Sequence, residues 1–309
     1  MPPVRSAESA RQRALVTGAL ILVQVFFGLH YLAAKVVLRE IPPRAWAVLR
    51  VAAAAVLLLA LARLLGRRLP SAPRDLLRLA VFSVFGVTLN QVLFVEGLAR
   101  TTPTHSSLIN TTIPIGTLIC AALLGRERPS WAKAAALAVA SGGVWLVIHR
   151  GQGPDATGVL VGDLLTLINA LSYSFFLVIT KRLLSRVDAL GATAVLLAFG
   201  AVGIALIGLP ALAHTDLRTV SATAWTLGGF IVVFPTAGAY LLQYWALARV
   251  ESSVVAFFVY LQPLIAAALS FALLHERPAP RVLAGGLLIF GGVYLALRRP
   301  GDRRGPASC

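Results

Sequence analysis

The sequence predicts an all-α integral membrane protein with ten transmembrane helices arranged as two inverted five-helix repeats. Three observations predict this class: the composition, the spacing of the apolar runs and an internal repeat. The chain has 309 residues, of which 58% are hydrophobic and 13% are charged, and its mean hydropathy is +0.82. Soluble domains carry about 25% charged residues. A soluble or disordered chain is therefore excluded, and the bilayer is the solvent that remains.

Ten apolar runs are each long enough to cross a membrane as a helix, which takes about 20 mostly apolar residues. They lie near 14–38, 44–65, 76–98, 103–124 and 130–148 and, after a polar break at 150–155, near 158–180, 189–212, 223–247, 252–274 and 279–297. Residues 14–148 thus form the first repeat and 158–297 the second. Short basic tails, 1–13 and 298–309, flank them. The first run is longer than the 7–15 apolar residues of a signal peptide, so we expect a retained helix.

The positions of the basic residues predict the orientation. With the N-terminus inside, the cytoplasmic segments hold 19 of the 28 Lys and Arg residues, whereas the outer loops hold 7. Because Lys and Arg accumulate on the cytoplasmic side, we expect a multi-pass protein of the cell membrane with both termini in the cytoplasm. The formal charge of +16 is spread over short clusters between apolar runs rather than gathered on one face. Nucleic acid is therefore not an expected partner.

The two halves repeat at a shift of 149 residues. Residues 97–148 and 246–297 share 13 identities in 52 aligned positions, and Lys35 pairs with Lys181 at a slightly different shift. A repeat of five helices ends on the opposite side from where it began, so the second repeat enters the membrane inverted. Inverted repeats are the architecture of many secondary transporters, because one fold in two orientations provides two states of similar energy.

Several motifs recur within these repeats. They are Phe27–Tyr31 followed by Lys35, Arg50, Pro114, Gly125–Glu127 and Gly142–Val144 in the first half, with Leu274–Glu276 and Gly291–Val293 in the second. Both halves resemble the repeats of the EamA-like family of the drug/metabolite transporter superfamily. The resemblance implies ten helices, a central cavity and the movement of small metabolites, and many relatives export amino acids or related compounds. His30 departs from the family pattern, which often has a small polar residue at this position.

Four ionisable residues inside spans are candidates for gating or coupling, because burying such groups costs roughly 2.5–3.5 kcal/mol on insertion scales. His30 could contact substrate or relay a proton, or could be a neutral histidine held by a neighbouring helix. We expect Glu96 to be the only acidic residue well inside a hydrophobic stretch. It could bind a zwitterion, couple to protons, or form an ion pair with Lys35 or Arg50 at the outer gate.

Polar and aromatic residues within the spans are the candidates for the cavity lining. Pro114 and Pro263 occupy corresponding positions, each follows polar residues, and a proline in a span frees a backbone carbonyl. The alternative is that these polar groups join helices, worth about 0.6 kcal/mol per contact. The candidates are His30, Tyr31, Asn90, Gln91, Asn110, Thr111, Pro114, Tyr173, Tyr240, Gln243, Tyr260, Gln262 and Pro263.

These features predict a secondary transporter that moves a small polar or amphipathic metabolite, outward, by alternating access. Glu96 and His30 would permit proton exchange, whereas facilitated diffusion needs neither. The sequence contains no P-loop, H-E-x-x-H or G-x-S-x-G motif, so we expect no ATP hydrolysis, catalytic residue, cofactor or metal. A membrane enzyme acting on lipid and a non-transporting sensor or subunit are the alternative classes.

Overall fold

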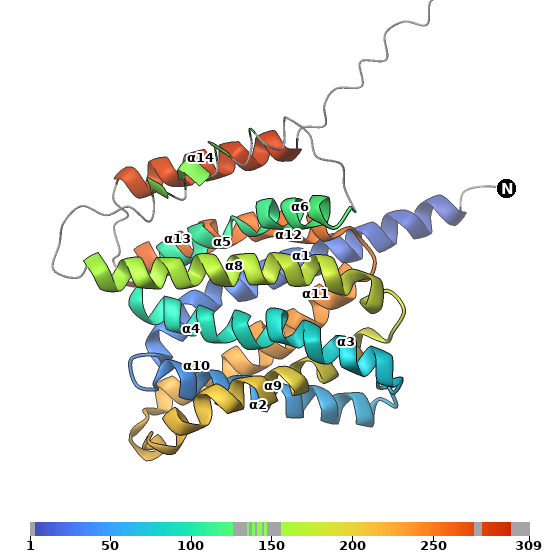
Figure 1. Ribbon diagram of the computed structural model, residues 1–309, viewed down its shortest axis with the longest axis horizontal. Coiled ribbons are helices and arrows are strands. Elements are labelled where there is room, and N and C mark those ends of the chain that lie inside the picture. The colour runs from blue at the N-terminus through green and yellow to red at the C-terminus, as the bar shows by residue number, and fades with distance from the viewer. Residues whose placement is uncertain are drawn as a thin grey trace, which may run out of the picture.

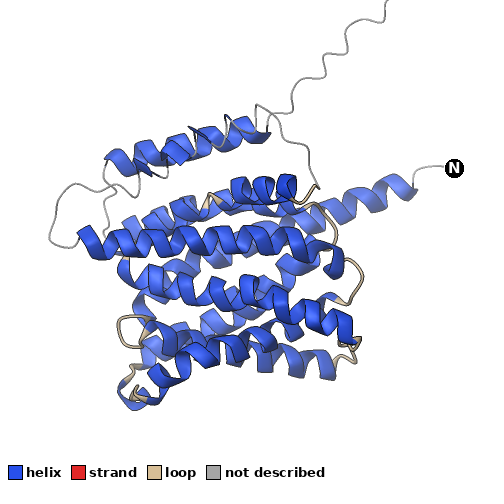
Figure 2. Cartoon of the chain, in the orientation of Figure 1, coloured by secondary structure: helices blue, strands red, loops and turns tan. Residues whose placement is uncertain are grey.

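The computed structural model describes residues 4–125, 156–274 and 280–297, together with 135, 138, 139, 141–143, 145 and 146. Figure 2 shows this part of the chain as helices joined by short loops. The first half contains α1 (Val4–Val37), α2 (Pro43–Leu64), α3 (Pro73–Ser83), the π-helix η1 (Val84–Leu89), α4 (Asn90–Arg100), α5 (Pro103–Asn110) and α6 (Ile113–Leu123).

The second half contains α8 (Ala156–Leu184), α9 (Ala189–Ala213), the 3₁₀ turn η2 (Leu217–Thr219), α10 (Ala222–Ile231), the π-helix η3 (Val232–Gly238), α11 (Ala239–Leu247), α12 (Ser252–Phe257), the 3₁₀ turn η4 (Phe258–Tyr260), α13 (Leu261–Leu274) and α14 (Pro280–Leu297). The helices lie side by side in one bundle (Figure 1). α2 and α9 pack together along one edge, and α14 lies along the opposite edge beside α5 and α6.

Seven described helical stretches are long and apolar enough to cross a membrane: Arg11–Val37, Pro43–Leu64, Pro73–Arg100, Pro103–Leu123, Thr157–Leu184, Ala189–Ala213 and Ala222–Leu247. They correspond to seven of the predicted spans. Two shorter apolar helices, Ser252–Ile265 and Pro280–Gly292, lie within the predicted ninth and tenth spans. Most of the predicted fifth span, 130–148, lies outside the described residues. The all-helical membrane class is confirmed, and ten crossings stay a prediction.

Large apolar side chains cover the outside of the bundle. Val56 is 67% exposed, Leu206 80% and Leu287 74%, and each lies within an apolar helix. In water, each Å² of apolar surface left exposed would lose about 25 cal/mol of the free energy that burial provides. In a bilayer the lipid tails cover them, so this outer surface fits a protein that spans the membrane.

Local sequence signals set where the helices begin and end. Pro43, Pro73 and Pro103 each occupy the first helical turn, where a missing N–H leaves no bond unmade. The Thr102 side chain accepts a hydrogen bond from the His105 N–H at 3.2 Å, which caps α5. Gly66, just after α2, has a φ of +60°, a conformation that favours glycine.

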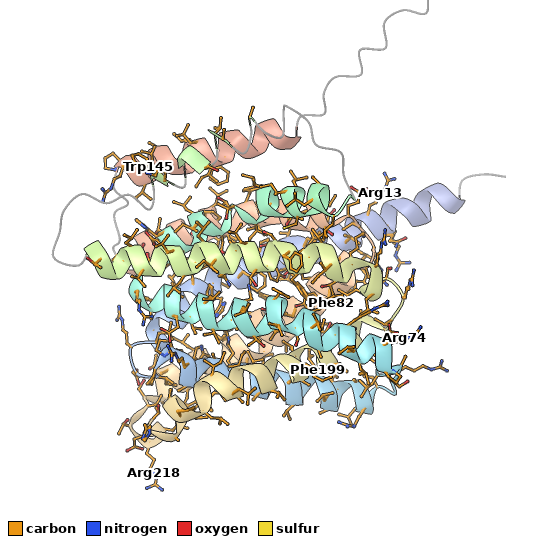
Figure 3. All side chains as sticks on the ribbon, viewed as in Figure 1. Arg13, Arg74, Phe82, Trp145, Phe199 and Arg218 are labelled. Carbon is orange, nitrogen blue, oxygen red and sulfur yellow. The ribbon has the colours of Figure 1, made fainter. Side chains whose placement is uncertain are left out.

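The loops gather at two ends of the bundle. Figure 3 places Arg13 and Arg74 at one end and Arg218 at the other. The predicted orientation assigns the first two to the cytoplasmic side and Arg218 to an outer loop. We therefore call the end that holds Arg218 the outer end and the end that holds Arg74 the inner end. Which of them faces the cytoplasm stays a prediction.

The two halves share an irregularity in their third helices. Each of these helices changes to π-helical geometry, over Val84–Leu89 in the first half and Val232–Gly238 in the second. The two segments coincide at the 149-residue shift. A π-turn holds an extra residue and rotates the following turns, and such turns are frequent at functional sites. The rotation sets the direction of the side chains that follow, Asn90 and Gln91 in one half and Tyr240 in the other.

The fourth and ninth predicted spans are both interrupted before their prolines. A turn at Thr111 and Thr112 separates α5 from α6, and η4 separates α12 from α13. Pro114 lies two residues and Pro263 three residues beyond an interruption, and neither has an N–H for the carbonyl four residues earlier. Discontinuous helices at matching positions of two repeats are typical of transporter binding sites.

Two lysines make equivalent contacts in the two halves. The Lys35 Nζ donates to the carbonyls of Leu98 at 2.8 Å and Thr101 at 2.6 Å, at the outer end. The Lys181 Nζ donates to the carbonyl of Leu247 at 3.2 Å and to that of Val250, at the inner end. These acceptors correspond at the shift of 149. Each lysine therefore joins the first helix of its repeat to the C-terminal end of the third, where unpaired carbonyls attract a cation.

Candidate functional site

A small central cavity of about 60 Å³ lies between the two halves of the chain. It is smaller than the roughly 300–1,000 Å³ that most small-molecule pockets enclose. Its lining comes from the first, second, third and fourth spans of the first half and from the first, third and fourth of the second. The lining residues are Phe27, His30, Tyr31, Arg50, Asn90, Gln91, Phe94, Asn110, Ile113, Asn169, Tyr173, Pro235, Thr236, Tyr240, Gln243, Val259 and Gln262.

Most of the predicted cavity residues lie along this lining. They are His30, Tyr31, Asn90, Gln91, Asn110, Tyr173, Tyr240, Gln243 and Gln262, and the gate candidate Arg50 joins them. Asn169, Phe94, Pro235 and Thr236 also line the cavity but were not among the predicted cavity residues. Thr236 follows Pro235 inside η3, and a proline within an apolar run is the signal that could have found both.

Four predicted residues lie outside the lining. Pro114 and Pro263 are buried at the helix interruptions. The Thr111 hydroxyl donates to the Leu108 carbonyl, so its hydrogen bond is made within its own helical segment. The Tyr260 ring packs against Phe290 at a centroid distance of 5.9 Å. These residues shape the interrupted helices, and any contact between them and a substrate stays a prediction.

Two hydrogen-bond networks join the halves across the cavity. In the first, Asn110 Nδ2 donates to the Tyr31 hydroxyl at 2.6 Å, and that hydroxyl donates to Gln262 Oε1 at 3.0 Å. Gln262 Nε2 in turn donates to Gln24 Oε1 at 2.6 Å. These bonds connect α1 and α5 of the first half to α13 of the second. The polar side chains of this network thus find their hydrogen-bond partners on other helices.

The second network lies where the two third helices meet. Gln91 Nε2 donates to the Tyr240 hydroxyl, which donates to Asn90 Oδ1 at 3.1 Å. Gln91 and Tyr240 are counterparts at the shift of 149, so the two repeats meet through equivalent positions. Asn169 Nδ2 donates to the Asn90 carbonyl at 2.6 Å, which adds the first helix of the second half.

Arg50 supplies the fixed charge of the cavity. Its side chain is 0% exposed, its Nη1 lies 2.6 Å from His30 Nε2, and its guanidinium carbon lies 5.9 Å from the Phe94 ring centre. Since a guanidinium can only donate, the His30 Nε2 must be the acceptor of this bond. The Nε and Nη2 atoms of Arg50 have no hydrogen-bond partner among the described residues. Arg50 is therefore a buried cation with two nitrogen donors that lack an acceptor among the described residues.

Acceptors without partners complement these donors. Gln91 Oε1, Asn110 Oδ1 and both amide atoms of Gln243 have no hydrogen-bond partner in the described part of the chain. Leaving a buried polar group unpaired costs about 1–3 kcal/mol. A ligand that offers both acceptors and donors would recover part of this cost. Carboxylate and ammonium groups are the matching chemistry.

The predicted ion pair of Glu96 with Lys35 or Arg50 is wrong. The Glu96 carboxylate pairs with Arg44 Nε at 2.8 Å and with Arg100 Nη1. Glu96 lies near the end of its helix, level with the start of α2 and not with Arg50, which lies two turns further in. Lys35 binds the carbonyls that end α4 instead. The ion pair was predicted from the similar depth of these residues in the membrane. Depth does not determine the direction in which a side chain points.

The structure also contains a buried acid that the sequence reasoning missed. Asp163 in α8 is 0% exposed, so Glu96 is not the only acidic residue inside a hydrophobic stretch. His105 Nδ1 lies 3.1 Å from Asp163 Oδ2, and the Thr101 hydroxyl donates to Oδ1. Asp163 lies only five residues after the expected start of its span, which made it look like a residue of the loop.

The family model of the EamA-like transporter family matches residues 16–149 and 160–298. A probable terminal-alkyne amino-acid exporter of Streptantibioticus cattleyicolor is 31% identical over 292 residues, which cover 94% of this chain and 96% of that protein. An uncharacterized inner membrane transporter of Escherichia coli (strain K12), YedA, is 24% identical and covers 93% of this chain and 92% of its own length. A solved crystal structure with 19% identity has a TM-score of 0.65 and covers 91% of this chain and 97% of its own, which shows the fold alone.

Both repeats are matched by the family model, and the relatives span nearly their whole lengths. The resemblance drawn from the motifs is thereby confirmed, as is the transporter class over the enzyme. The chain belongs to the EamA-like transporter family and is a multi-pass integral membrane transporter.

Proposed function

We propose that this transporter exports amino acids, or related small amphipathic carboxylates, across the cell membrane by alternating access. The observation that carries the proposal is the buried Arg50 guanidinium, which keeps two unpartnered nitrogens in a cavity lined by both halves. A substrate carboxylate would accept bonds from these two nitrogens in the bidentate geometry that arginine favours. It would also neutralise a cation whose burial alone costs several kcal/mol.

The rest of the lining suits the remainder of an amino acid. An ammonium group has three donors, and Gln91 Oε1, Asn110 Oδ1 and Gln243 Oε1 are acceptors in need of one. Apolar substrate side chains would pack on the rings of the lining, which include Phe27 and Phe94. The relative that is named an amino-acid exporter supports both the substrate class and the outward direction.

The test is equilibrium binding of matched ligand pairs to the purified protein. Each amino acid of a panel that includes propargylglycine, a terminal-alkyne amino acid, is compared with its methyl ester. The ester keeps the ammonium and the side chain but loses the negative charge. We expect esterification to weaken binding at least tenfold, because a hydrogen bond to a charged group is worth about 1.5–3 kcal/mol.

Two variants of the same helix complete the design. Arg50→Gln should weaken binding of the acid and abolish the discrimination between acid and ester. Arg63→Gln, an exposed arginine near the end of α2, is the matched control and should bind like the wild type. Equal affinity of the wild type for an acid and its ester would contradict the proposed substrate class.

A further inference from the structure

The outer end of the bundle contains an ionisable pair outside the cavity. Asp163 in α8 and His105 in α5 are 0% and 5% exposed, and the His105 Nδ1 lies 3.1 Å from the Asp163 Oδ2. The Thr101 hydroxyl donates to the other carboxylate oxygen. Ionisable groups inside a membrane protein are costly to bury and mark functional sites by default.

Close glycine packing holds the carboxylate in place. A Cβ on Gly97 of α4 would lie 2.9 Å from the Gly162 carbonyl, and a Cβ on Gly162 would lie 2.8 Å from the Gly97 carbonyl. Backbones can approach this closely only where both residues are glycine. The contact brings the last turn of α4 against the residue before Asp163, so the carboxylate faces Thr101 and the start of α5.

The geometry defines how the pair takes up a proton. An ionised carboxylate can only accept hydrogen bonds, so with Asp163 charged the His105 Nδ1 carries the hydrogen between them. The His105 Nε2 then keeps its lone pair. Uptake of one proton at Nε2 converts a carboxylate beside a neutral imidazole into a carboxylate–imidazolium pair. The charge of the pair changes from −1 to 0.

The repeat does not reproduce the pair at the inner end. At the shift of 149, the counterpart of His105 is Val254, and at the shift of 146 that aligns Lys35 with Lys181, the counterpart of Asp163 is Thr17. Neither residue can exchange a proton. Among the described residues, these two positions of the inner end therefore hold no ionisable pair.

Thr101 connects the pair to the closure of the outer end. Its hydroxyl bonds Asp163, while its carbonyl accepts from the Lys35 Nζ at 2.6 Å. One residue is thus held by α8 on one side and by α1 on the other. A change of charge in the Asp163–His105 pair therefore acts, through the Thr101 hydroxyl, on the residue that holds the outer end of α1.

Other charged groups surround the pair. Lys35 reaches Thr101 from α1, and α4 contributes Arg100, whose guanidinium binds Glu96. Arg44 of α2 binds the same carboxylate. α14 packs against α5 and carries Arg281 near its outer end. The described residues of α13, which also packs on α5, include no titratable side chain, and α6 contributes the thiol of Cys120.

The elements packed on the rest of α8 carry further titratable groups. These are Arg74, Asp75 and Arg78 of α3, Tyr240 and Tyr244 of α11, and Glu251 before α12. The π-helix η1, also packed on α8, has no titratable side chain. α3 and α12 begin at the inner end, and Tyr240 bonds Asn90 and Gln91 at the cavity. The charges nearest the pair are thus those of the outer end.

The pair also lies close to the cavity along one helix. His105 and the lining residue Asn110 are five residues apart on α5, which at 1.5 Å per residue is about 7.5 Å. The pair thus lies less than two helical turns from the cavity lining along α5.

We propose that Asp163 and His105 form the proton-binding site that couples export to the proton gradient. The pair takes one proton from the outer medium when the outer end is open. It releases that proton through the cavity to the cytoplasm when the inner end is open, in exchange for the exported molecule. The inference rests on the proposed function for the molecule that is exchanged, but the proton site itself is testable without any substrate.

The first experiment is NMR of the histidine side chains in the full-length protein in nanodiscs. We expect one imidazole signal, absent in His105→Gln, to titrate, and Asp163→Asn to lower its proton affinity at least tenfold because the neighbouring negative charge is gone. His214→Gln, at the exposed end of α9, is the matched control and leaves the signal in place. An unchanged titration in Asp163→Asn, or a signal that never titrates between pH 4 and 10, would overturn the proposal.

The second experiment compares two modes of transport in proteoliposomes, with radiolabelled amino acids as the probes. Accumulation driven by a pH gradient needs proton binding, whereas exchange of labelled for unlabelled substrate does not need net proton movement. Asp163→Asn and His105→Gln should each lower gradient-driven accumulation at least tenfold and lower exchange less than threefold. Equal loss of both modes in folded protein would contradict a coupling role. Absence of both modes in the wild type would overturn the proposed substrate class and leave the NMR result decisive for the proton site.

Discussion

At the scale of single residues, the contact between Arg50 and His30 explains why an ionisable side chain lies in the first helix. The His30 ring accepts from Arg50 Nη1 at 2.6 Å and stacks on Phe94 at a centroid distance of 5.0 Å. His30 therefore fixes one edge of the guanidinium and leaves its Nε and Nη2 directed away from this contact. Of the roles considered for His30, this geometry favours the neutral histidine held by a neighbouring helix, and here the residue of that helix is Arg50.

Replacement of His30 tests this positioning role. His30→Phe keeps the stacking on Phe94 but removes the acceptor, so we expect the affinity for an amino-acid substrate to fall about tenfold, the equivalent of 1.4 kcal/mol. His30→Gln retains an acceptor and should bind closer to the wild type. The measurement is equilibrium binding of both variants to the same ligand. Equal affinities of His30→Phe and the wild type would show that the contact has no effect on binding.

A second residue-scale prediction concerns Glu40 in the loop after α1. Its carboxylate accepts from the Ser221 N–H at 2.7 Å and from the Ser221 hydroxyl at 2.8 Å, and these bonds lower its pKa. A lowered pKa in the folded state stabilises the protein above the unfolded pKa, near 4.3, and the gain is lost as the pH falls through the folded value. Glu40→Gln should therefore unfold at a lower temperature than the wild type at pH 6, with the difference shrinking toward pH 3.

Thermal unfolding in detergent across this pH range is the measurement. Glu40 is fully exposed, so the difference in unfolding temperature should be small. Ser221→Ala removes the hydroxyl donor and keeps the N–H donor. In the Ser221→Ala background, Glu40→Gln should therefore lower the unfolding temperature by less than it does in the wild type, but not by zero. A gap between wild type and Glu40→Gln that grows on acidification would have the wrong sign and would contradict the account.

At the scale of elements, the proposed alternating access predicts that the two lysine contacts close opposite ends of the bundle. Lys35 holds the outer end of α1 to the end of α4, and Lys181 holds the inner end of α8 to the residues that follow α11. A charged hydrogen bond is worth about 1.5–3 kcal/mol, so its loss would raise the population of a state open at that end about tenfold or more.

Accessibility of the cavity from each side measures this effect. We expect a cysteine placed at Asn90, in a Cys120→Ser and Cys309→Ser background, to react faster from outside when Lys35 is changed to Met. Lys181→Met should speed the reaction from the inside instead. Lys133→Met serves as a control for the loss of one positive charge. If both closure variants raised labelling from the same side, the two lysines could not be closures of opposite ends.

The elements also show what could be read from the sequence. Hydropathy placed the spans because a membrane helix must be apolar throughout, and the repeat indicated the interruptions before Pro114 and Pro263. The partners of Glu96 could not be read in this way. The π-helix Val84–Leu89 changes the helical phase before Glu96, and no local signal fixes a rotation that depends on packing against α8 and α9.

The cavity was easier to predict than its connections. Polar residues such as Gln91 and Tyr240 stood out against an apolar background, and their placement in the lining follows from the cost of exposing them to lipid. Their bond to each other depends on the meeting of two inverted helices, which only the folded chain brings about. Asp163 and His105 were missed for the related reason that a residue near a helix end can be buried by its neighbours.

At the scale of the whole molecule, the two ends are closed by related contacts between the halves. Glu40, after the first helix of one repeat, binds Ser221 at the outer end, and Asp188, after the first helix of the other, lies 3.7 Å from Arg67 at the inner end. Each contact joins the loop after the first helix of one repeat to the loop between the second and third helices of the other. Under the proposed alternating access, a structure in which both contacts are formed would be the closed intermediate between two open states, and an inverted repeat would make those states similar in energy.

The most direct test of this account is solute counterflow in proteoliposomes that contain only the purified protein. The vesicles are preloaded with one unlabelled amino acid, and a trace of the same labelled compound is added outside. A carrier that alternates between two states predicts transient accumulation of the label above its outside concentration, in the wild type and in Arg63→Gln but not in Arg50→Gln. No accumulation across the whole amino-acid panel, with the protein folded and reconstituted, would contradict the proposed export of amino acids through this cavity.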